Sequence, residues 1–367
     1  MKRKNIVFFM PFIGIGGVEK NLFLIANHVS KKKDNIYVCT SSRKCKKKFN
    51  SNIKIISPTK IFSDKVGVRI RYIYCLFVLY SFLIKNKNTL VFCFQANVYC
   101  ILLCKILNIK IIVRSNTSPS GWKHNFLKEF FYKKIINLAD DVVVNSIEFK
   151  NQMKKKFRIN PVFIYNPLNK NEIIKKSKEK FSFNFFNNKR CLKIINVARL
   201  TEQKDHITIL KSAEILKDKN INFRLLIIGS GDEGTNLKNF IKDKKLDNFV
   251  KVINFQNNPY KFINNADIFI LSSKYEGLPN TLIEAALLKK FIITTNCPTG
   301  PKEITLNGKG ALIFKVGDYI DLSNKIIKIK NNRKKFKNKI KSIYNSLYRF
   351  DYNINLKKYY SLINKYT

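Results

Sequence analysis

Short apolar runs typical of buried strands alternate with helical patterns along almost all of the 367 residues. Such alternation indicates parallel sheets covered by helices on both faces, because each crossover between parallel strands carries a helix. We therefore predict an α/β fold. The strands predicted in the first half are Ile6–Met10, Ile36–Cys39, Ile53–Ile56, Leu90–Phe94, Ile111–Arg114, Asp141–Val144 and Val162–Tyr165. Those predicted in the second half are Lys193–Val197, Arg224–Ile228, Val250–Phe255, Ile268–Leu271, Ile292–Thr295 and Ala311–Phe314.

The two series of strands predict two Rossmann-like domains, which is the number that the chain length favours. The first domain is predicted over residues 1–166 and the second over 191–345, with a polar linker over 167–190 between them. Residues 319–367 are lysine-rich and amphipathic, and we expect the last of them, 346–367, to form a helical tail that packs back on the first domain.

Hydrophobic residues make up 45% of the chain, which excludes a disordered protein. The longest clean apolar run, Tyr72–Ile84, is shorter than the roughly 20 residues that span a bilayer. No convincing export signal opens the sequence. The eight cysteines form no CxxC pair and mostly stand in apolar stretches. They predict reduced core residues of a cytoplasmic protein, and neither they nor the acidic and His residues show the spacing of a metal site.

The net charge of +46 raises the question of an anionic partner, either nucleic acid or a membrane surface. Residues 1–166 carry a net charge of +24 and the remaining residues +22, so the charge is spread almost evenly. A binding face concentrates its charge, and this even spread favours a largely solvated lysine background. Attraction to an acidic membrane surface stays open, and we predict no nucleic-acid partner.

A glycine-rich turn follows the first predicted strand and includes Gly16 and Gly17. Glycines between a strand and a helix let an anionic group approach the backbone amides, although a tight turn alone would also require them. A dinucleotide-binding fingerprint would need a third glycine where Glu19 stands. The sequence therefore favours a phosphate contact over an NAD site, with no bound cofactor.

Arg199 and Lys204 flank the loop after the first strand of the second series. Open α/β sheets bind ligands at the carboxyl ends of their strands, and two cations there suit a diphosphate. A solvated pair of cations is the alternative in a chain with 70 basic residues.

The segment Ser272–Ala286 carries two glutamates, Glu276 before a predicted helix and Glu284 inside its apolar run. A buried carboxylate needs a partner from the protein or from a ligand. Most of the intervening residues are predicted helical, which places the glutamates on the order of 10 Å apart. That separation disfavours retaining glycosidase chemistry. It suits two anchors on an elongated ligand, and a capping Glu276 with a structural Glu284 is the alternative.

The combination of these motifs resembles family 4 glycosyltransferases of the GT-B fold, which carry an R-L-x-x-x-K motif and an E-x7-E motif. Here these are Arg199–Lys204 and Glu276–Glu284. The resemblance extends to Gly229-Ser230-Gly231 and to Cys297–Ile304, a segment similar to bacterial surface-polysaccharide sugar transferases. In the first domain it rests on Gly16–Glu19 and Ala139–Ser146.

This resemblance implies two domains facing across a cleft, with a nucleotide-sugar, UDP-linked, held mainly by the second domain and the acceptor by the first. Arg199 and Lys204 would stabilise the diphosphate and Glu284 would hold the ribose. Glu276 would contact the transferred sugar, with the backbone of Gly277, Leu278, Pro279 and Asn280 around it, while Gly16 and Gly17 would reach the phosphates.

The implied reaction is retaining, metal-independent transfer of a hexose or N-acetylhexosamine to a saccharide or lipid-linked acceptor. Its place would be capsule, O-antigen or lipopolysaccharide assembly on the cytoplasmic face of the membrane. Many relatives carry a His after the strand equivalent to Ile111–Val113, where this chain has Arg114-Ser115-Asn116. We expect Arg114 or Asn116 to bind donor or acceptor instead. The alternative is a non-transferring relative such as a nucleotide-sugar epimerase, which would need acid and base groups that are scarce near these motifs.

Overall fold

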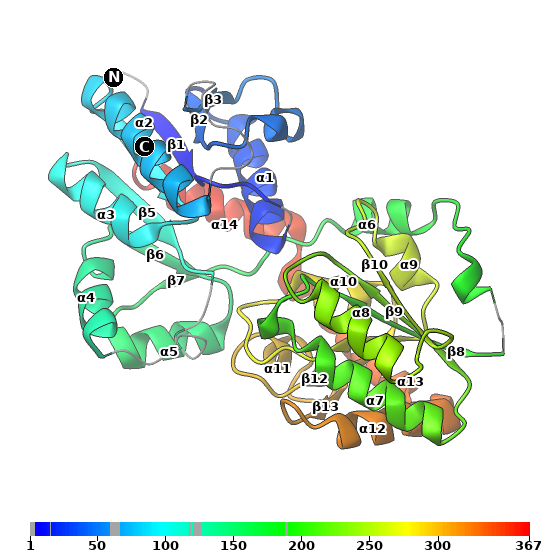
Figure 1. Cartoon of the computed structure of the whole chain (residues 1–367). Coiled ribbons are helices and arrows are strands. Elements are labelled where there is room, and N and C mark those ends of the chain that lie inside the picture. Colours follow the sequence, from blue (N-terminus) through cyan, green and yellow to red (C-terminus); the bar gives the residue numbers. More distant parts are fainter. Residues whose placement is uncertain (1–3, 15, 59–66, 117–118, 120–125, 188–189) are drawn as a thin grey trace. The chain divides into compact units, whose positions relative to one another are not determined.

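The computed structural model describes residues 4–14, 16–58, 67–116, 119, 126–187 and 190–367 (Figure 1). The chain divides into two compact units, each built on its own parallel sheet. The first unit comprises residues 1–167 and 352–367, and the second comprises residues 168–351. The polypeptide therefore completes the second unit before its last helix returns to the first.

The first unit holds seven parallel strands in the order β3-β2-β1-β4-β5-β6-β7. The order reverses between β1 and β4, so the loops that follow these two strands diverge to opposite sides of the sheet. The strands are β1 (Asn5–Phe9), β2 (Ile36–Cys39), β3 (Lys54–Ile56), β4 (Thr89–Cys93), β5 (Lys110–Arg114), β6 (Asp141–Val144) and β7 (Val162–Phe163).

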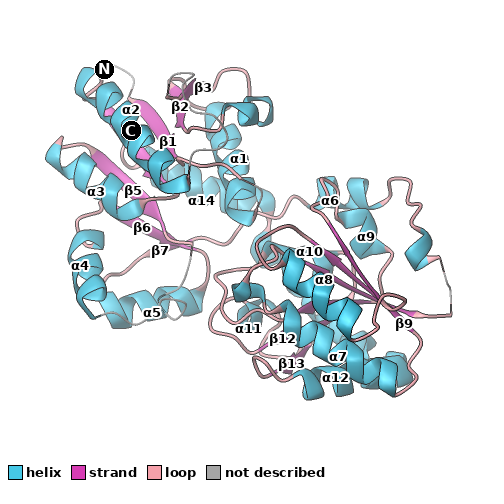
Figure 2. Cartoon of the chain, in the orientation of Figure 1, coloured by secondary structure: helices cyan, strands magenta, loops and turns pink. Residues whose placement is uncertain are grey.

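Helices cover both faces of this sheet (Figure 2). They are α1 (Gly17–Ser30), η1 (Arg43–Lys48), α2 (Val68–Lys85), α3 (Asn97–Ile106), α4 (Phe126–Ile136), α5 (Ile147–Phe157) and α14 (Tyr352–Asn364). Successive side chains of a strand point to opposite faces, and β1 shows the result. Ile6 and Phe8 pack in the core with α1 and α14, whereas Val7 and Phe9 pack in the core with α2, α3 and α5.

The second unit holds six parallel strands in the order β10-β9-β8-β11-β12-β13. They are β8 (Leu192–Val197), β9 (Phe223–Ile228), β10 (Val250–Ile253), β11 (Ile268–Leu271), β12 (Phe291–Thr295) and β13 (Leu312–Phe314). The helices are α6 (Lys170–Ser177), η3 (Asn184–Phe186), η4 (Glu202–Lys204), α7 (His206–Asp218), α8 (Gly234–Asp243), α9 (Tyr260–Asn264), α10 (Asn280–Leu287), α11 (Pro301–Ile304), α12 (Tyr319–Asn331), α13 (Arg333–Asn345) and η5 (Ser346–Phe350). Its core joins β8 to α7 and α12 through residues such as Ile194, Ile209 and Ile326.

The α/β prediction is confirmed, and each predicted strand is present with its ends within two residues of the predicted position. The residues predicted as a linker, 167–190, include α6 and η3, and those after Pro167 group with the second unit. Asn258 Nδ2, for example, donates to the Lys176 carbonyl at 2.8 Å. Of the predicted tail, η5 belongs to the second unit and α14 to the first.

The eight cysteines are all buried and free of disulfides, which confirms that they are core residues. No helix in the described ranges is both long and apolar enough to cross a membrane.

Candidate functional site

Two loops at the centre of the second sheet carry most of the predicted site residues. They follow β8 and β11, the adjacent strands between which the strand order reverses. The carboxyl ends of strands at such a reversal are where open α/β sheets form ligand sites. Arg199, Lys204 and Glu276 therefore lie where the strand order favours a ligand site, as the sequence predicts.

Backbone contacts join these two loops. Lys274 N donates to the Gln203 carbonyl at 2.8 Å, and Gln203 Nε2 donates to the Tyr275 carbonyl at 2.8 Å. Ser272 Oγ donates to the Lys204 carbonyl at 2.7 Å. These bonds fix the register between segments about seventy residues apart in sequence, and they bring Lys204 opposite Glu276.

Lys204 and Glu276 form an ion pair with 2.5 Å between Nζ and Oε1. Their side chains are only 13% and 7% exposed, so the pair is largely removed from water. Ser273 Oγ donates to the same Oε1 at 2.6 Å. Removing two charges from water costs several kcal/mol per ion, and such a pair is held only when its geometry and added hydrogen bonds compensate. Glu276 Oε2 has no hydrogen-bond partner among the described residues, and it is the oxygen available to a ligand.

The turn from Glu276 into α10 is held by the loop after β12. Thr299 Oγ1 donates to the carbonyls of Glu276 and Gly277. A Cβ on Gly300 would lie 2.1 Å from the Gly277 carbonyl oxygen, so only glycine permits this close approach. The sequence singled out the segment 297–304 through the family resemblance but did not identify these contacts, because they join residues more than twenty positions apart.

Arg199 lies exposed on the loop after β8, and its guanidinium has no hydrogen-bond or ion-pair partner in the described part of the chain. Its neighbour Leu200 is fixed by the Gly229–Gly231 turn. Leu200 N donates to the Ser230 carbonyl at 3.0 Å, and Gly231, with φ of 156°, leaves room where a Cβ would lie 2.2 Å from the Leu200 carbonyl oxygen. The backbone is thus positioned while the cation stays available to an anion.

Glu284 is buried inside α10, as its apolar surroundings predicted. Tyr260 Oη, from the first residue of α9, donates to Glu284 Oε1 at 3.4 Å. Sequence reasoning missed Tyr260. None of the motifs named in the sequence indicated a partner for Glu284.

His206, which the sequence analysis did not single out, is buried and close enough to Lys204 to interact with its charge. His206 Nε2 and Asn196 Oδ1 are 3.1 Å apart, and Asn196 Nδ2 donates to the Ile270 carbonyl at 2.8 Å. Since the Asn196 amide is already a donor to Ile270, the His206 Nε2–H donates to its oxygen. Burial, and secondarily the charge of Lys204, lower the pKa of His206 from 6.5 to about 4.

This neutral His206 predicts an acid-sensitive second unit. The folded protein keeps the ring neutral while the unfolded chain binds a proton below pH 6.5, so its contribution to stability is full above pH 6.5 and declines as the pH falls toward about 4. The expected slope is at most about 1.4 kcal/mol per pH unit. Urea unfolding across this range should show a shallower pH dependence for His206→Gln than for the unmodified protein. Equal slopes would contradict the assignment.

In the first unit, Gly16 precedes α1 and Gly17 is its first residue. A Cβ on Gly16 would lie 2.7 Å from Glu19 Oε2, so the acid of the first helical turn folds back over this glycine. That oxygen is the far end of a flexible side chain, so the contact alone does not require glycine at position 16. The predicted approach of phosphates to Gly16 and Gly17 stays a prediction.

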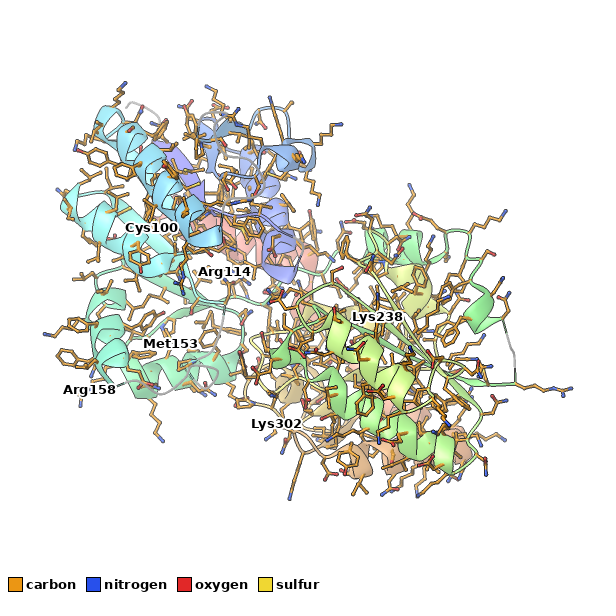
Figure 3. The ribbon with its side chains drawn as sticks, in the orientation of Figure 1. Cys100, Arg114, Met153, Arg158, Lys238 and Lys302 are labelled. Atoms are coloured by element: carbon orange, nitrogen blue, oxygen red, sulfur yellow. The ribbon has the colours of Figure 1, made fainter. Side chains whose placement is uncertain are left out.

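Arg114 is fully buried at the end of β5, with 1% of its surface exposed (Figure 3). Nε donates to Tyr359 Oη of α14 at 3.2 Å, a terminal nitrogen donates to Asn166 Oδ1 at 2.7 Å, and the other donates to Asn116 Oδ1. The expectation that Arg114 itself binds donor or acceptor does not agree with this burial. Its guanidinium is committed to neutral oxygens that join β5 to α14, and it orients Asn116.

Asn116 lies beside a hollow of about 370 Å³ at the carboxyl ends of β4 and β5. Its Nδ2 donates to the Phe94 carbonyl at 2.8 Å. The residues lining the hollow combine aromatic rings with amides and are Val18, Phe94, Gln95, Ala96, Asn97, Val98, Tyr99, Ser115, Asn116 and Tyr132. Aromatic faces with a few polar groups are a lining suited to a small ligand.

Two family models match this chain. "Glycosyltransferase Family 4" matches residues 15–172, and "Glycosyl transferases group 1" matches residues 177–345. The first match covers most of the first unit and ends just inside the second, the other match lies within the second unit, and η5 and α14 are beyond both.

Proteins of similar sequence come from an archaeon and from bacteria. An uncharacterised glycosyltransferase of Methanocaldococcus jannaschii is 35% identical over 223 residues, which are 56% of this chain and 53% of that protein. The N-acetylgalactosamine-N,N'-diacetylbacillosaminyl-diphospho-undecaprenol 4-alpha-N-acetylgalactosaminyltransferase of Campylobacter jejuni is 25% identical over 244 residues, or 64% of each chain. The matched regions thus span about half to two thirds of these relatives.

Among solved structures, HepE of Anabaena in complex with UDP-glucose superposes with a TM-score of 0.78. The match covers 99% of this chain and 100% of that one at 15% identity, and it shows a common fold.

Proposed function

Because the chain belongs to the glycosyltransferases, with a family 4 domain followed by a group 1 domain in the GT-B fold, we propose that it transfers a hexose or N-acetylhexosamine from a nucleotide-sugar, UDP-linked, to a saccharide or lipid-linked acceptor. The observation that carries this proposal is the buried Lys204–Glu276 pair at the strand-order reversal of the second sheet. The pair places a cation beside a carboxylate oxygen that can accept a hydrogen bond. A diphosphate joined to a sugar needs both, the cation for the diphosphate and the oxygen for a sugar hydroxyl.

In this proposal Arg199 and Lys204 bind the diphosphate, and Glu284 binds the ribose hydroxyls. Glu276 Oε2 accepts a hydrogen bond from a hydroxyl of the sugar. The bond between the anomeric carbon and the phosphate oxygen lengthens, negative charge builds on the diphosphate, and the two cations stabilise that charge without a divalent metal. Lys204 is already held in place by its pair with Glu276 before the reaction begins.

The proposed transfer retains anomeric configuration. The acceptor hydroxyl attacks the anomeric carbon from the face that the diphosphate leaves, a new glycosidic bond forms there, and the acceptor proton passes to the departing phosphate oxygen. No protein base is required, which fits the absence of a titratable side chain among the described residues lining the first unit's hollow other than Tyr99 and Tyr132.

We assign the acceptor to that hollow in the first unit. Phe94, Tyr99 and Tyr132 offer ring faces, while Gln95, Asn97 and Asn116 offer amide groups that can bind hydroxyls. The Campylobacter relative is named for a diphospho-undecaprenol acceptor, which supports a lipid-linked saccharide here and a role in capsule, O-antigen or lipopolysaccharide assembly at the cytoplasmic membrane face.

A donor screen tests the proposal. Purified protein is incubated with UDP-, GDP- and ADP-linked hexoses and N-acetylhexosamines, with and without lipid-linked saccharide acceptors, and release of nucleoside diphosphate is measured. We expect release with a UDP-sugar that rises when acceptor is added and that persists in excess chelator. Epimerised donor without acceptor would replace this proposal with the epimerase alternative, and chelator-sensitive turnover would overturn metal independence.

A further inference from the structure

The outward face of three neighbouring helices in the first unit, α2, α3 and α4, is apolar. We call it the α2–α4 face, and it consists of Ile70, Ile73, Tyr74, Phe77, Tyr80, Ile84, Tyr99, Leu102, Ile106, Leu127, Phe130 and Phe131, all of them exposed. The helices contact one another in sequence order, α2 with α3 and α3 with α4 (Figure 1). Contiguous exposed apolar surface of this kind marks an interaction site.

The helix α2 shows how complete this pattern is. One side buries Cys75, Leu79 and Leu83 at intervals of four residues, and these pack against the sheet. The opposite side would be polar in an ordinary surface helix, but here it exposes 61% of Phe77 and 53% of Ile73. The helix is thus apolar on both sides, which is why its sequence resembles a buried segment.

The two neighbouring helices repeat the pattern. On α3 the exposed positions are Tyr99, Leu102 and Ile106, and Ile106 is 80% exposed. On α4, Leu127 and Phe131 are 66% and 59% exposed. By contrast, α8 in the second unit exposes polar side chains such as Asn236 and Lys238, the latter labelled in Figure 3. The apolar face is therefore a local property and does not follow from the chain's general composition.

Positive charge surrounds the α2–α4 face. Arg69 and Lys85 are exposed near the two ends of α2, and the exposed Lys134 lies 4.6 Å from the centre of the Phe130 ring. The only acidic residue in the described parts of the three helices is Glu129, which is paired with Lys156 at 2.6 Å. An apolar surface with aromatic rings and a cationic rim has the composition of an element that lies in a lipid interface.

Charge also discriminates between the occupants of such a face. A second copy of this chain would bring two surfaces of the same positive sign together, in a protein of net charge +46. An anionic bilayer offers both an apolar interior for the rings and negative headgroups for Arg69, Lys85 and Lys134. We propose that the α2–α4 face docks on an anionic lipid bilayer.

This docking places the acceptor hollow at the lipid surface. Tyr99 belongs to the α2–α4 face and also lines the 370 Å³ hollow, and a second ring of that hollow, Tyr132, comes from α4. Resting on the proposed function, the inference is that a lipid-linked acceptor reaches this hollow without leaving the membrane.

Vesicle binding by the full chain tests the docking face. Phosphatidylcholine vesicles with and without phosphatidylglycerol are incubated with the protein, and the bound fraction is measured by flotation. We expect binding to the anionic vesicles that weakens with salt, and much less to the neutral ones. Phe77→Ser combined with Phe131→Ser should weaken binding by at least about tenfold, because two large rings lose their burial in lipid.

Matched controls come from the second unit. Ile320→Ser with Tyr348→Ser changes side chains that are 55% and 69% exposed and should leave binding unchanged. Lys85→Glu with Lys134→Glu should weaken binding to anionic vesicles, whereas Lys238→Glu with Lys328→Glu, equal in charge, should have a much smaller effect. All variants alter exposed side chains, and unchanged thermal unfolding confirms that each is folded.

Three outcomes overturn the docking face: equal binding to neutral vesicles, equal losses in the control variants, or a dimer in ultracentrifugation that the Phe77 and Phe131 changes abolish while vesicle binding persists. Nucleoside diphosphate release in vesicle-free solution with a soluble acceptor is measured in parallel and should be unaffected by those changes. Vesicle binding through this face without release from any donor would contradict the proposed function and leave the docking face standing. If nucleoside diphosphate is released but the Phe77 and Phe131 changes leave vesicle binding unaltered, the docking face is wrong and the proposed function stands.

Discussion

Replacing Lys204 by alanine is expected to lower turnover by about 10²-fold or more, by analogy with the loss of one fixed donor that stabilises developing negative charge. The same change leaves Glu276 buried at 7% exposure without its cation. Removing one partner of a buried pair costs about 3–5 kcal/mol, so the melting temperature of the second unit should also fall. Nucleoside diphosphate release and calorimetric unfolding measure the two effects.

The Arg199→Ala variant separates the loss of turnover from the loss of stability. Arg199 is exposed and has no partner in the described part of the chain, so its loss should lower turnover by a similar factor while leaving unfolding unchanged. Lys274→Ala is the matched control, because Lys274 lies between the same loops but pairs with Glu202, which is 84% exposed. Activity like that of the unmodified protein in both Arg199→Ala and Lys204→Ala would contradict their assignment to the diphosphate.

Glu276→Gln is expected to lower sugar transfer by about 10²-fold while leaving nucleoside diphosphate binding intact or tighter. A glutamine oxygen can still accept from Lys204 and from Ser273, so the two loops should remain joined. The negative charge that assists the developing positive charge on the sugar is lost. The charge of Lys204 is then no longer balanced, which favours the diphosphate. Calorimetry with UDP alone and turnover with the full donor give the two readings.

Glu284→Gln should give the complementary result. Glu284 is buried in α10 beside Tyr260 and is assigned to the ribose, so its change should weaken UDP and donor alike. Loss of UDP affinity in Glu276→Gln with retention in Glu284→Gln would show that the two roles are reversed. If neither variant loses activity, this segment is not the donor site.

The sequence was sufficient to predict the strands because each is a short apolar run bounded by turns, a signal that depends on neighbouring residues only. It also singled out Arg199, Lys204, Glu276 and Glu284 as candidates, because their spacing within two segments resembles a known family, and their roles stay predictions. It did not predict that Lys204 pairs with Glu276, nor that Thr299 and Gly300 hold the turn between Glu276 and α10. Those contacts join loops of different strands, and only the order of strands in the sheet brings them together.

Arg114 illustrates a different limit. A cation just after a strand of the first domain predicts a ligand contact, yet here Tyr359, Asn116 and Asn166 surround the guanidinium. Tyr359 lies 245 positions away, and no local pattern indicates that α14 covers this end of β5. The sequence suggested that the apolar Tyr72–Ile84 helix could lie against anionic lipid, but an apolar helix pattern does not distinguish burial in protein from exposure to a lipid surface, so it did not show which side of α2 is exposed.

The return of α14 to the first unit also sets an order on the biosynthesis of the protein. Residues 352–364 supply Leu356, Tyr359 and Ile363 to the core beside β1, and they leave the ribosome only after the whole second unit has been made. The first domain to be translated is therefore the last to be completed, and until then α1 covers its face of the sheet without α14. Since Tyr359 supports Arg114 and Arg114 orients Asn116, the acceptor hollow reaches its final form only in a chain translated through its last helix. A ribosome that stops early releases a protein whose loops after β8 and β11 are complete and whose first unit is not.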